Sequence, residues 1–400
     1  MLNTYLKRWQ QGDGHIAELQ EKALQNPTFM HYIKWLAERA YKRNALTVGK
    51  TSYPVAIFPA RFNQENNFSQ LLGSLSPDDE DKAFPEVFNT PGEMYLDILQ
   101  SQSPALWNGP TYCMQSLDLQ NDLRIDCTTG NYFDALISCD LLEFELLTAF
   151  GDEEPAFQDY AEFTESLTLR SALHQRGNPL FTDCGRSAAI GISTSILHRS
   201  TDGWRLLLRT CAPKIAKAER MLHAIPSGMM QPFGNAQRDF SILPTIYSEY
   251  LEEVWLHEEH DKFEGAEHLE EAPRLKTLHK MLDSGTAILQ FSGVATDLLK
   301  LRPEICMTLI INEASWFDEF RDEMQDRDDF KIAQSLDEVV EMGDDLNTIR
   351  TLSIPLRNGQ EGFNLLENCS FAPPGAAATF MGWRNAQRLI SLLSFKGARW

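Results

Sequence analysis

The chain has 400 residues, with 57 acidic against 36 basic side chains and a formal net charge of −21. Such an acidic excess repels the backbone of DNA or RNA, so we expect no nucleic-acid polymer as a partner. Hydrophobic residues make up 43% of the sequence, which excludes extensive disorder, and the length predicts two or three domains.

The first 185 residues predict a mixed α+β region. In chain order, the predicted elements are a helical segment over 1–45, an extended segment over 51–62, a loop over 73–92, two short strands joined near Gln120, and a helix over about 138–150 with Ser138 as its N-cap. This region carries no catalytic signature. Its predicted roles are dimerisation, capping of a substrate, or contact with a protein partner.

Residues 186–400 form the second predicted unit. Its predicted elements are a hairpin over 187–210, a short strand over 221–229, a helix over about 241–260, two strands over 285–299 and 304–313, and a final helix over 371–394 with Pro374 near its start. A polar loop, 231–240, precedes the helix that begins near 241.

The seven cysteines are scattered and include no C-x-x-C pair, which is typical of reduced thiols. The first residues lack the apolar core of a signal peptide, and no apolar run approaches the ~20 residues that span a bilayer. These features predict a cytoplasmic protein that does not contact a membrane.

The helix over 241–260 contains "SEYLEEVWL", in which Glu249, Glu252 and Glu253 occupy one narrow sector. Like charges at this spacing repel one another on an exposed helix. Carboxylates are also the ligands that hard divalent cations prefer. The pattern therefore predicts either a metal site or an acidic helix face exposed to solvent.

In its context, this stretch resembles the Nudix hydrolase signature G-x5-E-x7-R-E-U-x-E-E-x-G-U, where U is apolar. Glu249 matches the first glutamate of R-E-U-x-E-E, Glu252 and Glu253 match the pair, and Gly228 matches the leading glycine. The resemblance covers roughly residues 186–400. It implies an α/β fold, in which a Nudix-type α/β/α sandwich is built around a mixed sheet. The α+β region of residues 1–185 precedes this sandwich in the chain.

The chain departs from the signature at three positions and in one interval. Gly234 stands where the signature has a glutamate after G-x5, Ser248 stands in the arginine position, and Trp255 stands in the second glycine position. The loop before the helix is also longer. In the family, that arginine helps to hold the glutamates. Without it, we expect either a looser metal site or one supported by another cation, for which Arg238 and Arg220 are the candidates.

The resemblance implies a metal-dependent pyrophosphohydrolase that acts on a nucleoside diphosphate linked to another group. Glu249, Glu252 and Glu253 would be its catalytic residues and would hold Mg²⁺ or Mn²⁺. The alternative, which the departures favour, is a Nudix-fold nucleotide sensor or binding protein in a regulatory or defence assembly. A third reading is an acidic contact surface.

Four further residues are predicted to bind substrate. Arg205 and Arg209 share one face of the second hairpin strand, where they would meet phosphates or face solvent. Phe233 and Arg238 in the loop 231–240 would stack on a base and pair with a phosphate, unless the phenylalanines of this loop pack on the core.

Glu304 and Glu313 flank the last predicted strand. Each of these residues either supplies the site with a further carboxylate from outside the signature or lies at the surface, at the end of the strand.

Overall fold

The computed structural model describes residues 2–12, 19, 23, 28–61, 64–65, 68–76, 84–120, 122–150, 159–210, 221–256, 266–324, 330–333, 349–356 and 361–395. Helices and strands are mixed along the chain, and the sheets contain parallel and antiparallel pairs. The predicted α+β class is confirmed. No helix among these residues is long and apolar enough to cross a membrane.

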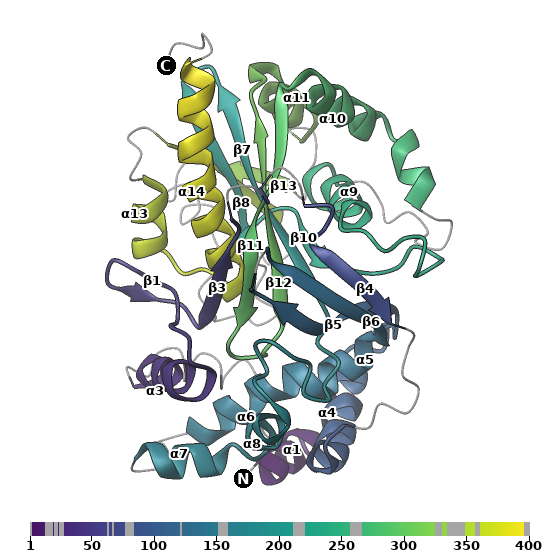
Figure 1. Ribbon diagram of the computed structural model, residues 1–400, viewed down its shortest axis with the longest axis vertical. Coiled ribbons are helices and arrows are strands. Elements are labelled where there is room, and N and C mark those ends of the chain that lie inside the picture. Colours follow the sequence, from purple (N-terminus) through teal and green to yellow (C-terminus); the bar gives the residue numbers. More distant parts are fainter. Residues whose placement is uncertain are drawn as a thin grey trace.

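The N-terminal part is mainly helical and gathers at one end of the molecule (Figure 1). Its helices are α1 (Leu2–Gln10), α3 (Phe29–Leu36), α4 (Asn89–Gln102), α5 (Tyr132–Ala135), α6 (Leu141–Phe150), α7 (Tyr160–Ser166) and α8 (Thr168–Arg176), with the π-helices η1 (Ala37–Tyr41) and η3 (Leu136–Asp140) and the 3₁₀-helix η2 (Glu86–Phe88). A three-stranded sheet, in the order β4 (Leu72–Ser76), β6 (Arg124–Asn131), β5 (Pro110–Asp118), packs beside them. A small hairpin pairs β1 (Thr47–Val48) with β2 (Thr51–Ser52).

Two predictions in this part are wrong. The segment 73–92 is not a loop throughout, because β4 and the start of α4 lie within it; residues 77–83 are outside the described part of the chain. The helix predicted from Ser138 begins at Tyr132 instead. Ser138 lies inside η3, where its hydroxyl donates to the carbonyl of Asp134 (2.6 Å) and accepts from the amide of Ser187 (2.9 Å). Its hydrogen bonds thus tie the helix to the chain that enters the central sheet.

The central sheet has the order β13-β14-β8-β7-β12-β11-β3, with β10 paired to β7 and β9 paired to β8. Its strands are β3 (Val55–Pro59), β7 (Gly191–Ser200), β8 (Gly203–Thr210), β9 (Leu222–Ala224), β10 (Ser227–Met229), β11 (Ala287–Asp297), β12 (Pro303–Ile311), β13 (Phe330–Ala333) and β14 (Ile349–Pro355). Strand β7 runs parallel to β12, and the β7–β8 and β11–β12 neighbours are antiparallel. The predicted hairpin and the two predicted apolar strands are confirmed.

Helices cover both faces of this sheet (Figure 1). Those on one face are α13 (Glu361–Asn368) and α14 (Pro373–Phe395), and those on the other are α9 (Leu243–Glu249), α10 (Pro273–Ser284) and α11 (Ala314–Met324). Alternate residues of β8 join different cores, because side chains alternate across a strand: Leu206 and Leu208 pack with α14, while Leu207 packs with α11. The architecture is a three-layer α/β/α arrangement around a mixed sheet.

A strand from the N-terminal part forms one edge of the central sheet. Strand β3 pairs antiparallel with β11, from Gly293 opposite Pro59 to Asp297 opposite Val55. One hydrophobic cluster also joins Leu142 of α6 to Ile305 of β12. The two predicted units, 1–185 and 186–400, therefore share a sheet and a core, and their division stays a prediction.

The glutamate-bearing helix begins at Leu243 as α9 and continues as the π-helix η4 (Tyr250–Val254). The amide of Trp255 donates to the carbonyl of Tyr250 (3.3 Å), which is the wider spacing of a π turn. Its predicted extension to 260 runs into residues outside the described part.

Candidate functional site

The three glutamates have different partners. Glu253 accepts a hydrogen bond from the backbone amide of Ser227 (2.6 Å) and forms an ion pair with Arg209. Glu252 accepts one from the hydroxyl of Ser248 (2.6 Å). Ser248, which stands in the arginine position of the signature, therefore holds one glutamate itself.

Arg209 supplies the cation for which Arg238 and Arg220 were the candidates. Its guanidinium contacts the carboxylate of Glu253 and also donates to the hydroxyl of Ser227 (3.2 Å). Burial raises the pKa of Glu253, and the Arg209 guanidinium and the Ser227 amide offset only part of that rise. Arg238 instead pairs with its neighbour Asp239 (2.9 Å), and Arg220 lies outside the described part.

Glu249 lies against strand β10. A Cβ atom on Gly228 would collide with the Glu249 carboxylate, so a glycine at this position allows the helix to approach the strand. Glu249 and Glu253 thus meet adjacent residues, Gly228 and Ser227, as their spacing of one helical turn allows.

As placed, these carboxylates do not fit a three-glutamate metal site. One oxygen of Glu253 accepts a hydrogen bond from Arg209 and the other accepts one from Ser227. Glu252 accepts its hydrogen bond from Ser248. Among the described residues, no group of three or more His, Cys, Asp or Glu side chains lies together in a way that could hold a metal ion. The Mg²⁺ or Mn²⁺ site stays a prediction.

Two of the predicted substrate-binding residues are buried. Arg205 is 5% exposed; it pairs with Asp202 (3.0 Å) and donates to the hydroxyl (2.9 Å) and carbonyl (2.6 Å) of Ser353. Phe233, also 5% exposed, packs in the core with Trp255 and Trp316. In this state, Arg205 does not face solvent and Phe233 does not face a ligand.

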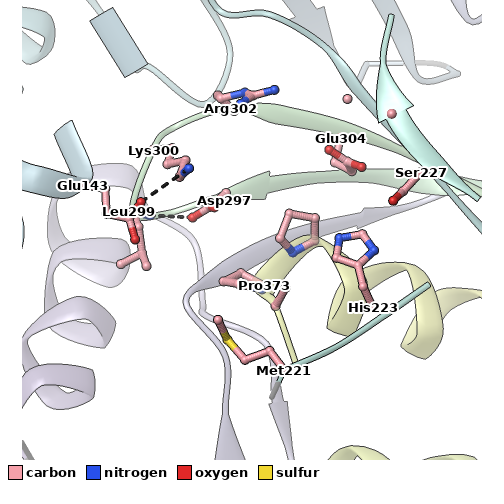
Figure 2. A pocket seen from close by; sticks show the side chains of 14 residues that line it. Glu143, Met221, His223, Ser227, Asp297, Leu299, Lys300, Arg302, Glu304 and Pro373 are labelled. Carbon is pink, nitrogen blue, oxygen red and sulfur yellow. Dashed lines mark hydrogen bonds and ion pairs between the residues drawn. The ribbon is translucent and has the colours of Figure 1, made fainter. Parts of the chain in front are cut away.

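A cavity of about 320 Å³ lies on the α14 side of the sheet (Figure 2). Its charged and titratable lining residues are Glu143 of α6, His223 of β9, Asp297, Lys300 and Arg302 at the β11–β12 turn, and Glu304 of β12. Pro373 and Pro374, at the start of α14, close another side, and Ser227 and Gly228 line it from β10. Strand β10 therefore borders both this pocket and the glutamate helix.

The two basic side chains of the pocket are paired to the end of η3 and the start of α6. Lys300 contacts Asp140 (3.0 Å) and Glu143 (3.5 Å), and Arg302 contacts Asp140 (3.6 Å). Burial alone would raise the pKa of Asp140, but the two cations outweigh burial and hold this pKa below its usual value. This ion-pair network fixes one wall of the pocket.

Asp297 and Glu304 are not ion-paired in this way, although Lys300 and Arg302 offset part of the rise in their pKa values. Asp297 accepts from the amide of Leu299 (2.8 Å), and Glu304 accepts from the hydroxyl of Ser193. Neither forms an ion pair with any residue that the structure describes. Burial raises the pKa of Asp297 to about 6, with a further increase from Glu143, and raises that of Glu304 to about 7. A carboxyl with a pKa near neutrality in a pocket is suited to binding or proton transfer.

His223 lies across the pocket from Lys300 (Figure 2). Its Nδ1 bonds to the carbonyl of Ala224 (2.8 Å), which assigns the proton to Nδ1 and leaves Nε2 as an acceptor. Burial, with a smaller effect of Arg209, lowers its pKa to about 4. His223 is therefore neutral at pH 7.

Sequence reasoning singled out Glu304 but not its neighbours in the pocket. The only local signal was the charged turn "DLLKLRPE" between two apolar strands, which contains Asp297, Lys300 and Arg302. Nothing local connects this turn with Glu143 or His223. Comparison of the chain with protein-family models and with curated proteins finds no match.

Proposed function

We propose that the protein binds a small nucleotide-type ligand in the pocket beside Glu304, without metal-dependent hydrolysis. The observation that carries this proposal is the ion pair between Arg209 and Glu253. Together with the amide of Ser227, this guanidinium engages both oxygens of Glu253, and in this arrangement neither oxygen is left for a metal ion. This favours the binding-protein reading of the sequence over the hydrolase reading.

The pocket supports ligand binding by its size and its lining. A volume of about 320 Å³ lies at the lower end of the range for small-molecule sites. The lining offers an acceptor nitrogen on His223 and carboxyl groups on Asp297 and Glu304. Such groups orient a polar ligand through hydrogen bonds.

A metal-dependent pyrophosphohydrolase is the second candidate. The observation that favours it is the convergence of Glu249 and Glu253 on β10, at Gly228 and Ser227. For this activity, Mg²⁺ or Mn²⁺ with its substrate would have to displace Arg209 from Glu253. The predicted contact with a second copy or a protein partner through residues 1–185 is compatible with either function.

A panel of nucleotide sugars, dinucleotides and cyclic oligonucleotides tests the proposal, read by thermal shift and by phosphate release with and without Mg²⁺. We expect at least one compound to stabilise the protein without phosphate release. Stabilisation should be lost in Glu304→Gln and kept in Glu249→Gln. Mg²⁺-dependent phosphate release that Glu249→Gln abolishes would establish the second candidate instead.

A further inference from the structure

The pocket contains more negative than positive charge. Asp140, Glu143, Asp297 and Glu304 stand in or beside it, against Lys300 and Arg302. His223 adds no positive charge at pH 7, because its pKa is lowered to about 4 by burial. With all carboxyls ionised, these side chains sum to a net charge of −2.

The excess negative charge of the pocket lies on Asp297 and Glu304. Lys300 and Arg302 are engaged with Asp140 of η3 and Glu143 of α6. Asp297 and Glu304 sit at the same end of the β11–β12 hairpin, where the amide of Asp297 donates to the carbonyl of Arg302 (3.0 Å) and Glu304 pairs with Ala295. Asp297 is only 6% exposed. Lys300 and Arg302 offset only part of the cost of ionising Asp297 and Glu304, so both carboxylates would gain from a further cation bound between them.

We propose that the pocket binds a ligand through a cationic nitrogen group, an amine, amidine or guanidine, seated between Asp297 and Glu304. This inference rests on the proposed function, because it takes the same pocket as the ligand site. A phosphate group does not suit this position, because it would add negative charge beside two carboxylates. On a nucleotide-type ligand, the group seated here would be an amine, amidine or guanidine substituent, because the exocyclic amino groups of the bases are uncharged at neutral pH.

The pH dependence of binding follows from the groups that face these two carboxyls. Glu304 faces Ser193 of β7, Arg302 and Asp297. Asp297 also faces Glu143 of α6 and Lys300. His223 of β9 lines the same pocket. Because the pKa of Glu304 is raised to about 7, lowering the pH from 8 to 6 protonates it. A cationic ligand needs the ionised form, so its affinity should fall by about tenfold over that interval.

Three small probes of similar shape test the proposal: butylguanidinium, butylurea and butyl phosphate. The first two differ in charge but hardly in size, and the third is an anion. In calorimetric titrations of the full chain at pH 8, we expect butylguanidinium to bind at least tenfold more tightly than butylurea. Butyl phosphate should bind more weakly than either.

Substitutions test whether Glu304 and Asp297 produce the preference for the charged probe. Glu304→Gln and Asp297→Asn should each reduce the preference for butylguanidinium over butylurea to about twofold or less. The matched control is Glu313→Gln, because Glu313 is an exposed carboxylate just beyond the other end of β12. Thermal melts check that each variant is folded, and the pH dependence in the unaltered protein gives a readout that needs no variant.

Two kinds of result would overturn the inference. Equal affinity for butylguanidinium and butylurea would show that charge is not recognised, and tighter binding of butyl phosphate would show an anion site. Binding of none of the three probes would also reject it. The proposed function fails separately, if the nucleotide panel gives Mg²⁺-dependent phosphate release or no stabilisation.

Discussion

The guanidinium of Arg209 on β8 lies against the carboxylate of Glu253 in η4, 44 residues further along the chain. The amide of Ser227 on β10 donates to the other oxygen of that carboxylate (2.6 Å). This contact explains how the chain tolerates three glutamates with no basic residue among them: the balancing charge comes from a neighbouring strand. The helix is thereby tied to two strands of the sheet.

Removing this cation should destabilise the protein. Arg209→Met leaves Glu253, whose side chain is 15% exposed, without its cation, and loss of this partner from a partly buried pair should cost about 1–3 kcal/mol. Urea denaturation measures the change in the free energy of unfolding. Because Glu253→Gln removes the unbalanced charge, the double variant should recover much of that loss.

Arg321→Met is the matched control for this experiment. Arg321 is 43% exposed and its ion-pair partner on the same helix, Asp318, is 49% exposed, so the expected change is about 1 kcal/mol or less. If Arg209→Met and the double variant prove equally stable, the ion pair does not hold the helix.

Phe233→Ala should lower stability as well as any ligand binding. The ring is buried in the core beside Trp255 and Trp316, and truncation of a buried phenylalanine costs about 3–5 kcal/mol. The sequence left open whether this ring stacks on a base, in which case only binding would weaken, or packs on the core. Thermal denaturation distinguishes a core position from a binding position. Phe240→Ala is the comparison, and its expected effect is smaller because Phe240 is only half-buried. An unchanged melting temperature would place the ring outside the core.

Glu304→Gln should stabilise the ligand-free protein at pH 8 and have little effect near pH 4. The folded pKa is raised from 4.5 to about 7, so the folded state binds this proton more tightly than the unfolded state does. Between these two values, the Glu304 carboxyl therefore lowers stability as pH rises, by at most about 3 kcal/mol. Melting temperatures of both proteins from pH 4 to 8 should diverge as pH increases. A constant difference would mean that Glu304 titrates normally.

Gly293→Ala should disturb the joint between the N-terminal part and the central sheet. Gly293 has φ +147° at a bulge in β11, and an added Cβ would lie 2.8 Å from Sδ of Met381 and against the Phe58 carbonyl of β3. Backbone strain and overpacking together should cost about 2–4 kcal/mol. Gly203→Ala is the control, because Gly203 has φ +132° with nothing within 4 Å of its added Cβ. Equal losses in both variants would leave backbone strain as the whole effect.

The sequence by itself determined the regular elements around the site. The hairpin over 187–210, the strands over 285–313 and the final helix follow from local patterns of β-branched, apolar and turn residues, and the structure has all of them. Helical spacing likewise placed Glu249, Glu252 and Glu253 on one helix. The start of the helix near Ser138 was wrong because a serine inside a helix can bond to the carbonyl four residues earlier, as it does here with Asp134.

Only the tertiary structure decided what those side chains meet. Periodicity places Arg205 and Arg209 on one face of β8, but the neighbouring strands bury the first against Ser353 and bring the second to Glu253. The pocket unites Glu143 and Glu304, which are far apart in the chain. Local propensities act over a few residues, whereas ion pairs and cavities depend on which elements pack together, so no window of sequence contains them.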